Sequence, residues 1–195
     1  MVWDLVSKIN SGRKYHGPFQ KPIVLVGLMG AGKTSIGRKL AERMQVSFVD
    51  ADHEIEKAAG CTITEFFEKF GEKEFRRGEK RVIERLLKSG PCILATGGGA
   101  FMDPETRATI KNTAVSIWLN ADLNTLDDRL ARRSGRPLLQ TKNPRATLQS
   151  LMEKRYPIYA EADMTVDTIN GSVDATVDRV RESITDYFSQ TYEQR

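Results

Sequence analysis

The chain has 195 residues, with 30 basic and 26 acidic side chains and a formal net charge of +4. This length fits one α/β domain with its own core, and the mild, mixed charge suits an anionic substrate. Nucleic acid fits less well, because no basic stripe is interleaved with aromatic residues. No apolar run is long enough to cross a membrane. We expect a cytoplasmic protein that is a monomer and has no membrane or nucleic-acid partners.

The first twenty residues form an N-terminal extension, residues 1–20. Its apolar part is short, contains Asp4 and lacks a small-residue cleavage site, which argues against a secretory signal. A short amphipathic helix and a frayed terminus explain it equally well.

The most informative stretch runs from Gly27 to Thr34 and fits the phosphate-binding pattern G-x-x-x-x-G-K-[ST]. An apolar, β-branched run at 23–26 predicts a buried parallel strand before it, and 36–44 has helical spacing after it. Glycines allow successive backbone N–H groups to converge on phosphate oxygens at the start of that helix. We therefore predict a nucleotide site in which Lys33 reaches the β- and γ-phosphates and the Thr34 hydroxyl ligates Mg²⁺.

A second apolar strand is predicted over residues 46–52 and ends in Asp50 and Asp52. Side chains two positions apart on a strand point the same way, so we expect both carboxylates at the carboxyl edge of the sheet. Asp50 is placed to hold Mg²⁺ through its water shell, and Asp52 to accept a proton from a substrate hydroxyl. The alternative is that Asp52 only caps the following helix.

A charged helical region is predicted from 64 to 88, with a break near Gly71. Arg76 and Glu79 lie three positions apart in it and are therefore helical neighbours. The glutamate is placed to hold the guanidinium for a substrate carboxylate, which arginine binds with two hydrogen bonds. A solvated salt bridge on a charged face is the stronger explanation from the pattern alone.

The next buried strand, 92–96, opens directly into Gly97, Gly98 and Gly99. Three glycines at the carboxyl end of a core strand bring bare backbone close to whatever occupies the cleft. A flexible turn is the alternative, but it rarely needs three glycines.

Further strands are predicted at 114–119 and 163–167. The basic stretch at about 132–145 contains glycine and two prolines and is predicted to be a mobile lid. Its Arg133 and Arg136 are candidates for contact with the transferring phosphate, and a basic surface loop is the alternative.

In this order, the motifs resemble those of the shikimate kinase family over roughly residues 22–167. The matched positions are Gly27, Gly30, Gly32, Lys33, Thr34 and Gly37 in the P-loop, Asp50 and Asp52 in D-x-D, Phe75, Arg76 and Glu79 in F-R-x-x-E, the three glycines Gly97, Gly98 and Gly99, Arg136-Pro137-Leu138-Leu139 in the lid, and Arg155, Pro157 and Tyr159 in R-x-P-x-Y.

The resemblance implies an α/β P-loop kinase fold with a five-stranded parallel sheet, helices on both faces and a mobile lid, similar to nucleoside monophosphate kinases. It implies one such domain at 21–195. The implied reaction transfers the γ-phosphate of ATP to the 3-hydroxyl of shikimate with Mg²⁺, in chorismate and aromatic amino acid biosynthesis.

The resemblance also implies residue roles. Lys33, Asp52 and Arg136 would be catalytic, with Asp52 as the base, and Arg133 would lie against adenine, although Arg132 is adjacent. The nucleotide would be bound by Gly30, Ala31, Gly32, Lys33, Thr34, Ser35, Arg133 and Arg136, and Mg²⁺ by Thr34 and Asp50. Shikimate would be bound by Asp52, Arg76, Glu79, Gly97, Gly98, Gly99 and Arg155.

Two other functions remain open. A related small-metabolite kinase, such as a gluconate kinase, would use the same scaffold, but Arg76 and Arg155 fit a ring carboxylate better. A non-catalytic, nucleotide-binding module of similar sequence is the second alternative. Such modules usually lose Lys33 or Asp52, and both are present here.

Overall fold

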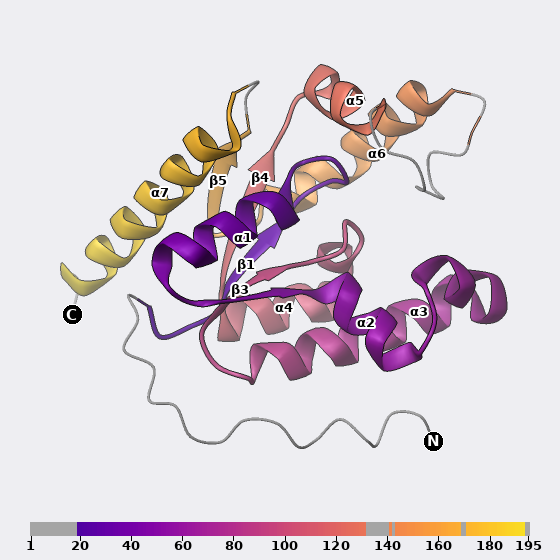
Figure 1. Ribbon diagram of the computed structural model, residues 1–195, viewed down its shortest axis with the longest axis horizontal. Coiled ribbons are helices and arrows are strands. Elements are labelled where there is room, and N and C mark those ends of the chain that lie inside the picture. Colours follow the sequence, from indigo (N-terminus) through magenta and orange to yellow (C-terminus); the bar gives the residue numbers. More distant parts are fainter. Residues whose placement is uncertain (1–18, 132–140, 142, 169–170, 194–195) are drawn as a thin grey trace.

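The computed structural model describes residues 19–131, 141, 143–168 and 171–193. Within these ranges the chain forms one parallel sheet of five strands in the order β2-β3-β1-β4-β5 (Figure 1). The strands are β1 (Ile23–Val26), β2 (Ser47–Asp50), β3 (Cys92–Ala95), β4 (Val115–Asn120) and β5 (Met164–Asp167). The predicted α/β fold with a five-stranded parallel sheet is confirmed.

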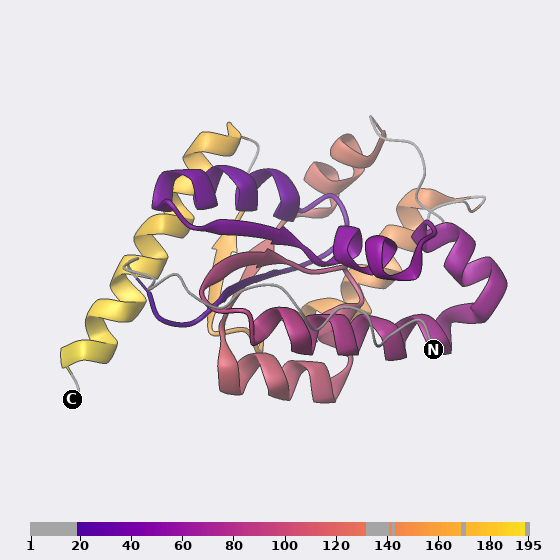
Figure 2. The same ribbon diagram turned by 60° about the horizontal axis from the view of Figure 1, so that its bottom comes forward.

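Helices cover both faces of this sheet (Figure 2). Helices α1 and α7 pack together on one face, and α3 and α4 lie side by side on the other. The helices are α1 (Lys33–Met44), α2 (Ala51–Ala59), α3 (Ile63–Leu87), α4 (Pro104–Thr113), α5 (Leu123–Ala131), α6 (Pro144–Tyr159) and α7 (Val173–Glu193), with a 3-10 turn η1 (Ala100–Met102) before α4.

The three central strands carry the core. Every residue of β1 and β3 is buried, and so are the first five residues of β4. The edge strands β2 and β5 are more exposed. This difference explains the sequence pattern, because strands covered on both faces read as continuous apolar runs.

The register of the strands brings the predicted motifs to one edge. Leu25 of β1 pairs with Ala95 of β3, and Asp50 of β2 pairs with the same alanine. Three motifs therefore lie together at the carboxyl edge of the sheet: the P-loop that follows β1, Asp50 at the end of β2, and the glycines that follow β3. The chain reverses its winding direction between β1 and β3, and ligands bind at such a switch point in open parallel sheets.

Helix α3 is broken as predicted. Gly71 has a φ of 76° and a ψ of 172°, which interrupts the helical backbone. The helix begins with a reciprocal cap between Thr62 and Glu65, in which each side chain accepts a hydrogen bond from the backbone N–H of the other. The long second part of α3 then carries Arg76 and Glu79 along the sheet.

The predicted lid is only partly described, and its end differs from the prediction. Helix α6 begins at Pro144, with Asn143 as its N-cap, so the last two residues of the predicted lid are helical. Residues 132–140 and 142, which include Arg133 and Arg136, lie outside the described residues.

The sequence placed Phe19 in the N-terminal extension, but its side chain is buried in the core. Its ring stacks with that of Phe188 on α7.

No helix in the described part of the chain is both long enough and apolar enough to cross a bilayer.

Candidate active site

The loop between β1 and α1 has the backbone that its glycines predict. Gly30 and Gly32 have φ values of 84° and 97°, a region that side chains with a Cβ rarely enter. Gly32 is the N-cap of α1 and supplies no capping side chain, so the positive end of that helix opens toward the loop. The Lys33 ammonium lies over the same loop and donates to the carbonyls of Gly27 at 2.7 Å and Leu28 at 2.9 Å.

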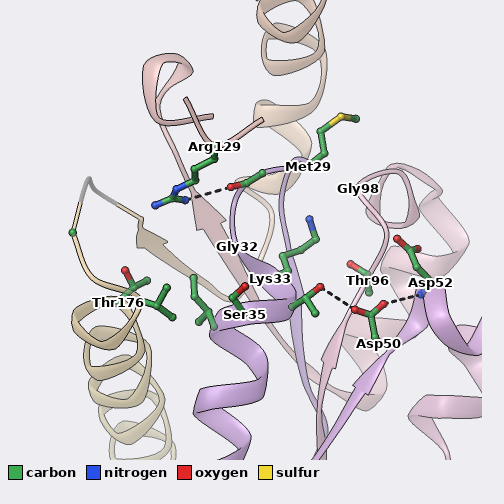
Figure 3. A pocket seen from close by; sticks show the side chains of 15 residues that line it. Met29, Gly32, Lys33, Ser35, Asp50, Asp52, Thr96, Gly98, Arg129 and Thr176 are labelled. Atoms are coloured by element: carbon green, nitrogen blue, oxygen red, sulfur yellow. Dashed lines mark hydrogen bonds between the residues drawn. The ribbon is translucent and has the colours of Figure 1, made fainter. Parts of the chain in front are cut away.

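A cavity of about 350 Å³ lies above this loop (Figure 3). The P-loop forms its floor, and residues from β2, β3, α5 and α7 or the segments that adjoin them form its walls. Its lining includes Met29, Gly30, Gly32, Lys33, Thr34, Ser35, Ile36, Asp50, Asp52, Thr96, Gly98, Arg129, Gly171, Val173 and Thr176. Ala31, which was also predicted to bind the nucleotide, does not line this cavity. It is buried, and its N–H donates to the carbonyl of Leu28.

Asp50 and Asp52 both line the cavity, but for a reason that differs from the predicted one. Strand β2 ends at Asp50, and Asp52 lies in the first turn of α2, so the two residues do not share an extended strand. Asp50 is the helix cap, because its Oδ1 accepts from the N–H of Asp52 at 3.1 Å. The alternative in which Asp52 is the cap is therefore wrong. The other oxygen of Asp50, Oδ2, accepts from the Thr34 hydroxyl at 2.9 Å.

The Arg76–Glu79 pair is partly enclosed. The Nη1 of Arg76 lies 2.6 Å from Oε2 of Glu79, whose side chain is only 3% exposed. Burial raises the pKa of Glu79 above its ordinary value, against the opposing effect of Arg76. The explanation as a solvated surface bridge is wrong for this pair, since one partner is withdrawn from water.

Two of the three glycines after β3, Gly97 and Gly99, leave room for charged side chains. A methyl group on Gly97 would lie 2.7 Å from Oδ1 of Asp52 and 2.9 Å from Oε1 of Glu79. A methyl group on Gly99 would lie 2.4 Å from Nη1 of Arg76. These separations are shorter than carbon atoms tolerate, so the glycine backbone is what lets the two carboxylates and the guanidinium meet here.

Gly98 joins this group to the P-loop. Its carbonyl accepts from Nη1 of Arg155 on α6 at 3.0 Å, and a Cβ on it would lie 3.5 Å from the backbone nitrogen of Met29. Residues from α2, α3, α6 and the glycine loop thus meet beside the cavity. All the predicted substrate residues belong to this cluster.

Arg129 on α5 is a cavity residue that the sequence reasoning missed. Its Nη1 donates to the P-loop carbonyls of Gly30 at 3.3 Å and Ala31 at 3.4 Å, and to the hydroxyl of Thr168 at 3.3 Å. Figure 3 shows its guanidinium on the wall opposite Asp50 and Asp52. Its place four residues before Arg133, on the helix that leads into the basic stretch, was the available signal.

A P-loop at the carboxyl edge of a parallel sheet, beside a carboxylate and a glycine loop that two arginines approach, defines a P-loop phosphotransferase for a small acceptor. The comparisons with known proteins agree with this class. The family model for shikimate kinase matches residues 29–185. A shikimate kinase of Paramagnetospirillum magneticum is 52% identical over 171 residues, which cover 88% of each chain. This chain therefore belongs to the shikimate kinase family, and it is an ATP-dependent kinase.

Solved structures support the same assignment. A shikimate kinase from Acinetobacter baumannii in complex with shikimate is 39% identical, with a TM-score of 0.82 over 86% of this chain and 94% of that chain. A shikimate kinase from Bacteroides thetaiotaomicron is 28% identical, with a TM-score of 0.80 over 86% and 99%. A gluconokinase from Sinorhizobium meliloti is 19% identical, with a TM-score of 0.54 over 87% and 97%, and shares the fold only.

Proposed function

We propose that this chain transfers the γ-phosphate of ATP to the 3-hydroxyl of shikimate at the described cavity. ATP would lie over the P-loop, and shikimate beside the glycines that follow β3. The convergence of Asp52, Glu79 and Arg76 on Gly97 and Gly99, next to the P-loop, is the observation that carries this proposal.

The acceptor would be held by its carboxylate. Arg76 and Arg155 approach the glycine loop from α3 and α6, and two guanidinium groups provide the planar pairs of donors that a carboxylate accepts. Glu79 fixes Arg76 through the 2.6 Å contact, so the guanidinium is oriented before the acceptor arrives. A carboxylate matches these donors in charge and geometry better than a neutral hydroxyl does, which favours an acid over a simple sugar.

Asp52 would be the general base. It lines the nucleotide cavity and also lies against Gly97, at the boundary between the two binding regions. From this position its carboxylate would accept the proton of the attacking hydroxyl as the phosphate is transferred.

Residues of the P-loop and Mg²⁺ would stabilise the negative charge that develops on the transferred phosphate. Lys33 would exchange its carbonyl partners, Gly27 and Leu28, for phosphate oxygens. Thr34 and Asp50 present two oxygen atoms 2.9 Å apart, a donor set that fits Mg²⁺ when the nucleotide and water supply the remaining ligands. When bound, Mg²⁺ would neutralise phosphate charge. We keep the sequence-based proposal that Arg136 closes on the phosphates and Arg133 lies against adenine.

The activity is tested by measuring ADP release from Mg·ATP with shikimate, gluconate, nucleoside monophosphates or no acceptor. Stimulation by shikimate alone is the expected result. Stimulation by gluconate instead would move the assignment to another metabolite kinase. ATP binding without stimulation by any acceptor would favour the non-catalytic alternative.

The role of the base is tested by Asp52→Asn. General-base catalysis contributes roughly 10²- to 10⁴-fold, so we expect kcat to fall by that factor while the affinity for ATP stays nearly constant. A variant that keeps its turnover would show that Asp52 is not the base.

We also propose that the single kinase domain acts as a monomer and does not need the N-terminal extension. Size-exclusion chromatography of the full chain, and the activity of a chain that begins at residue 19, test these two statements. Phe19 is retained because it is packed in the core.

A further inference from the structure

Tyr159, the last residue of α6, belongs to the R-x-P-x-Y pattern but has no role in the reaction proposed above. Its side chain is completely buried, with the rings of Trp118 at 6.1 Å and Phe101 at 6.4 Å from its own. Among these apolar neighbours, its hydroxyl donates to the carbonyl oxygen of Gly98 at 2.5 Å. A buried phenol normally has a hydrogen-bond partner, and here the partner is Gly98, the middle one of the three glycines after β3.

The same carbonyl oxygen accepts a second hydrogen bond, from Nη1 of Arg155 at 3.0 Å. A carbonyl oxygen has two lone pairs, so the hydrogen bonds from Tyr159 and Arg155 together occupy both lone pairs of the Gly98 oxygen. Arg155 and Tyr159 lie four residues apart on α6 and thus on one helical face. The shared oxygen couples their positions to each other.

The peptide planes in a run of three glycines are not held in one orientation by the run itself, because glycine has the largest backbone freedom and no side chain to anchor it. The peptide between Gly98 and Gly99 is trans, so its C=O and N–H groups point to opposite sides. Fixing the carbonyl of Gly98 therefore also fixes the direction of the N–H of Gly99. Gly99 lies against the guanidinium of Arg76, where an added methyl would clash.

We propose that Tyr159 is a positioning residue for the acceptor: its hydroxyl sets the Gly98–Gly99 peptide and, through the shared carbonyl, the guanidinium of Arg155. This inference rests on the proposed function, which gives Arg155 and the glycine loop their contact with the acceptor carboxylate. It adds a buried residue that does not touch the substrate but determines how well the site fits it.

The hydroxyl keeps its proton throughout the range in which the enzyme is assayed. Burial raises the pKa of Tyr159 to about 12. It therefore remains a donor, and its effect on acceptor binding should not change with pH near neutrality.

Tyr156 provides a matched control on the same helix. Its hydroxyl also donates to a backbone carbonyl, that of Ala121, and burial also raises its pKa to about 12. Ala121 follows β4 and is not part of the glycine loop. Tyr156→Phe therefore removes an equivalent hydroxyl without touching Gly98.

The experiment compares Tyr159→Phe with Tyr156→Phe in steady-state kinetics with shikimate and ATP. We expect Tyr159→Phe to raise KM for shikimate by roughly 2- to 12-fold, the factor that corresponds to one net hydrogen bond. KM for ATP should remain within about twofold, and Tyr156→Phe should leave both constants near those of the wild type. An unchanged KM for shikimate in Tyr159→Phe, or equal changes in both variants, would overturn the proposal.

A double-mutant cycle with Arg155→Ala separates this inference from the function on which it rests. If the hydroxyl and Arg155 act through the shared carbonyl, the effects of Tyr159→Phe and Arg155→Ala on KM for shikimate should not be additive. Additive effects would contradict the coupling. If Arg155→Ala alone leaves KM for shikimate unchanged, the assignment of Arg155 to the carboxylate fails instead.

A measurement on the wild-type protein avoids dependence on the folding of a variant. With ¹³C-labelled glycine, the carbonyl resonance of Gly98 should show the shift of a strongly hydrogen-bonded carbonyl, and it should keep that shift when shikimate is added. Loss of that shift on addition of shikimate would show that the carbonyl is released, which would overturn the proposal.

Discussion

Two neighbouring arginines on α3 form ion pairs of identical spacing. Arg76 pairs with Glu79 and Arg77 pairs with Glu74, each three residues away. In the sequence these pairs are equivalent, because both fit the same rule for helical neighbours. In the structure they differ in every property that matters for binding.

The difference is burial. Glu79 is 3% exposed and lies 2.6 Å from Arg76, whereas Glu74 and Arg77 are 48% and 61% exposed and lie 3.4 Å apart. The inner pair faces the glycines after β3, and the outer pair faces water, where an ion pair contributes little. Position relative to the sheet, and not the sequence spacing, therefore separates an arginine beside the glycine loop from one on the surface.

The comparison is tested most strongly by Arg76→Ala against Arg77→Ala. A hydrogen bond to a charged group contributes about 1.5–3 kcal/mol, so Arg76→Ala should raise KM for shikimate roughly 10- to 200-fold. KM for ATP should change little, because Arg76 does not line the nucleotide cavity. Arg77→Ala should leave both values near those of the wild type. Equal effects of the two variants would remove the distinction.

Glu79→Gln tests what burial does to the inner pair. The pKa of Glu79 is raised above its ordinary 4.5, chiefly by burial, so the folded protein holds this proton more tightly than the unfolded chain. As pH rises from 4.5 through the raised pKa, the free energy of unfolding of the wild type should therefore fall relative to Glu79→Gln. The slope is at most about 1.4 kcal/mol per pH unit for one proton.

Urea unfolding at several pH values measures this difference. Glu74→Gln serves as the control on the exposed pair and should follow the wild type within about 0.5 kcal/mol at every pH. A wild type that gains stability over Glu79→Gln with rising pH would contradict the raised pKa.

Arg129→Lys extends the comparison to a cation that donates hydrogen bonds to carbonyl and hydroxyl oxygens. A lysine keeps the charge but cannot reproduce the fork that joins the P-loop to Thr168. We expect KM for ATP to rise roughly 2- to 12-fold, with KM for shikimate unchanged. Arg145→Lys is the control, since Arg145 is half exposed and binds Asp127 and Asn124 on the outer side of α5. A larger effect on shikimate than on ATP would contradict the assignment of Arg129 to the nucleotide side.

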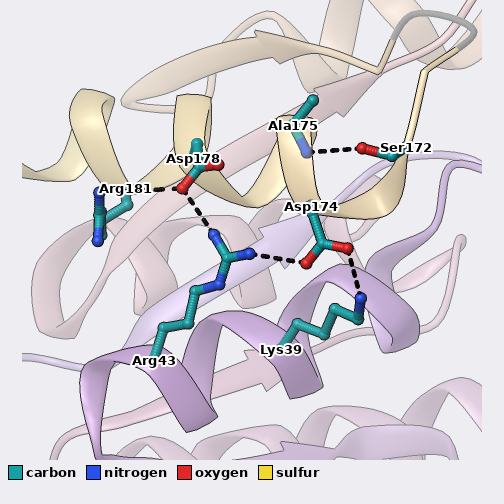
Figure 4. A network of polar contacts seen from close by, with 7 residues as sticks. All are labelled: Lys39, Arg43, Ser172, Asp174, Ala175, Asp178 and Arg181. Atoms are coloured by element: carbon teal, nitrogen blue, oxygen red, sulfur yellow. Dashed lines mark hydrogen bonds and ion pairs between the residues drawn. The ribbon is translucent and has the colours of Figure 1, made fainter.

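The smallest effect is expected at the exposed network between α1 and α7 (Figure 4). Asp174 lies 2.7 Å from both Lys39 and Arg43, but it is 50% exposed. Asp174→Asn should therefore lower the free energy of unfolding only slightly, and the loss should shrink in high salt. Denaturant unfolding at low and high ionic strength measures it. A loss as large in high salt as in low salt would show that packing of α7, and not charge, is responsible.

The sequence was sufficient for the fold and for the backbone geometry of the P-loop. Continuous apolar runs predicted the central strands β1, β3 and β4, because strands buried on both faces need such runs. Gly30, Gly32 and Lys33 lie within four consecutive positions of the chain, so their local geometry follows from local sequence. The break at Gly71 was visible for the same reason.

The acceptor side could not be derived from pattern alone, because its parts lie far apart in the chain. Asp52, Arg76, Gly97 and Arg155 come from four separate segments, and only the parallel order of the strands and the packing of α3 and α6 bring them together. Resemblance to a family suggested the set in advance, but the physical reason for it is tertiary.

Local sequence thus determined the P-loop, the central strands and the chemistry available in each segment. Tertiary structure decided that Glu79 is buried while Glu74 is solvated, and that Arg129 reaches the P-loop. The reason is that hydrogen bonds and backbone angles within a few residues are set by those residues, whereas burial depends on which distant segments pack above them. The buried hydroxyl of Tyr159 on the Gly98 carbonyl, 61 residues away, belongs to this second kind.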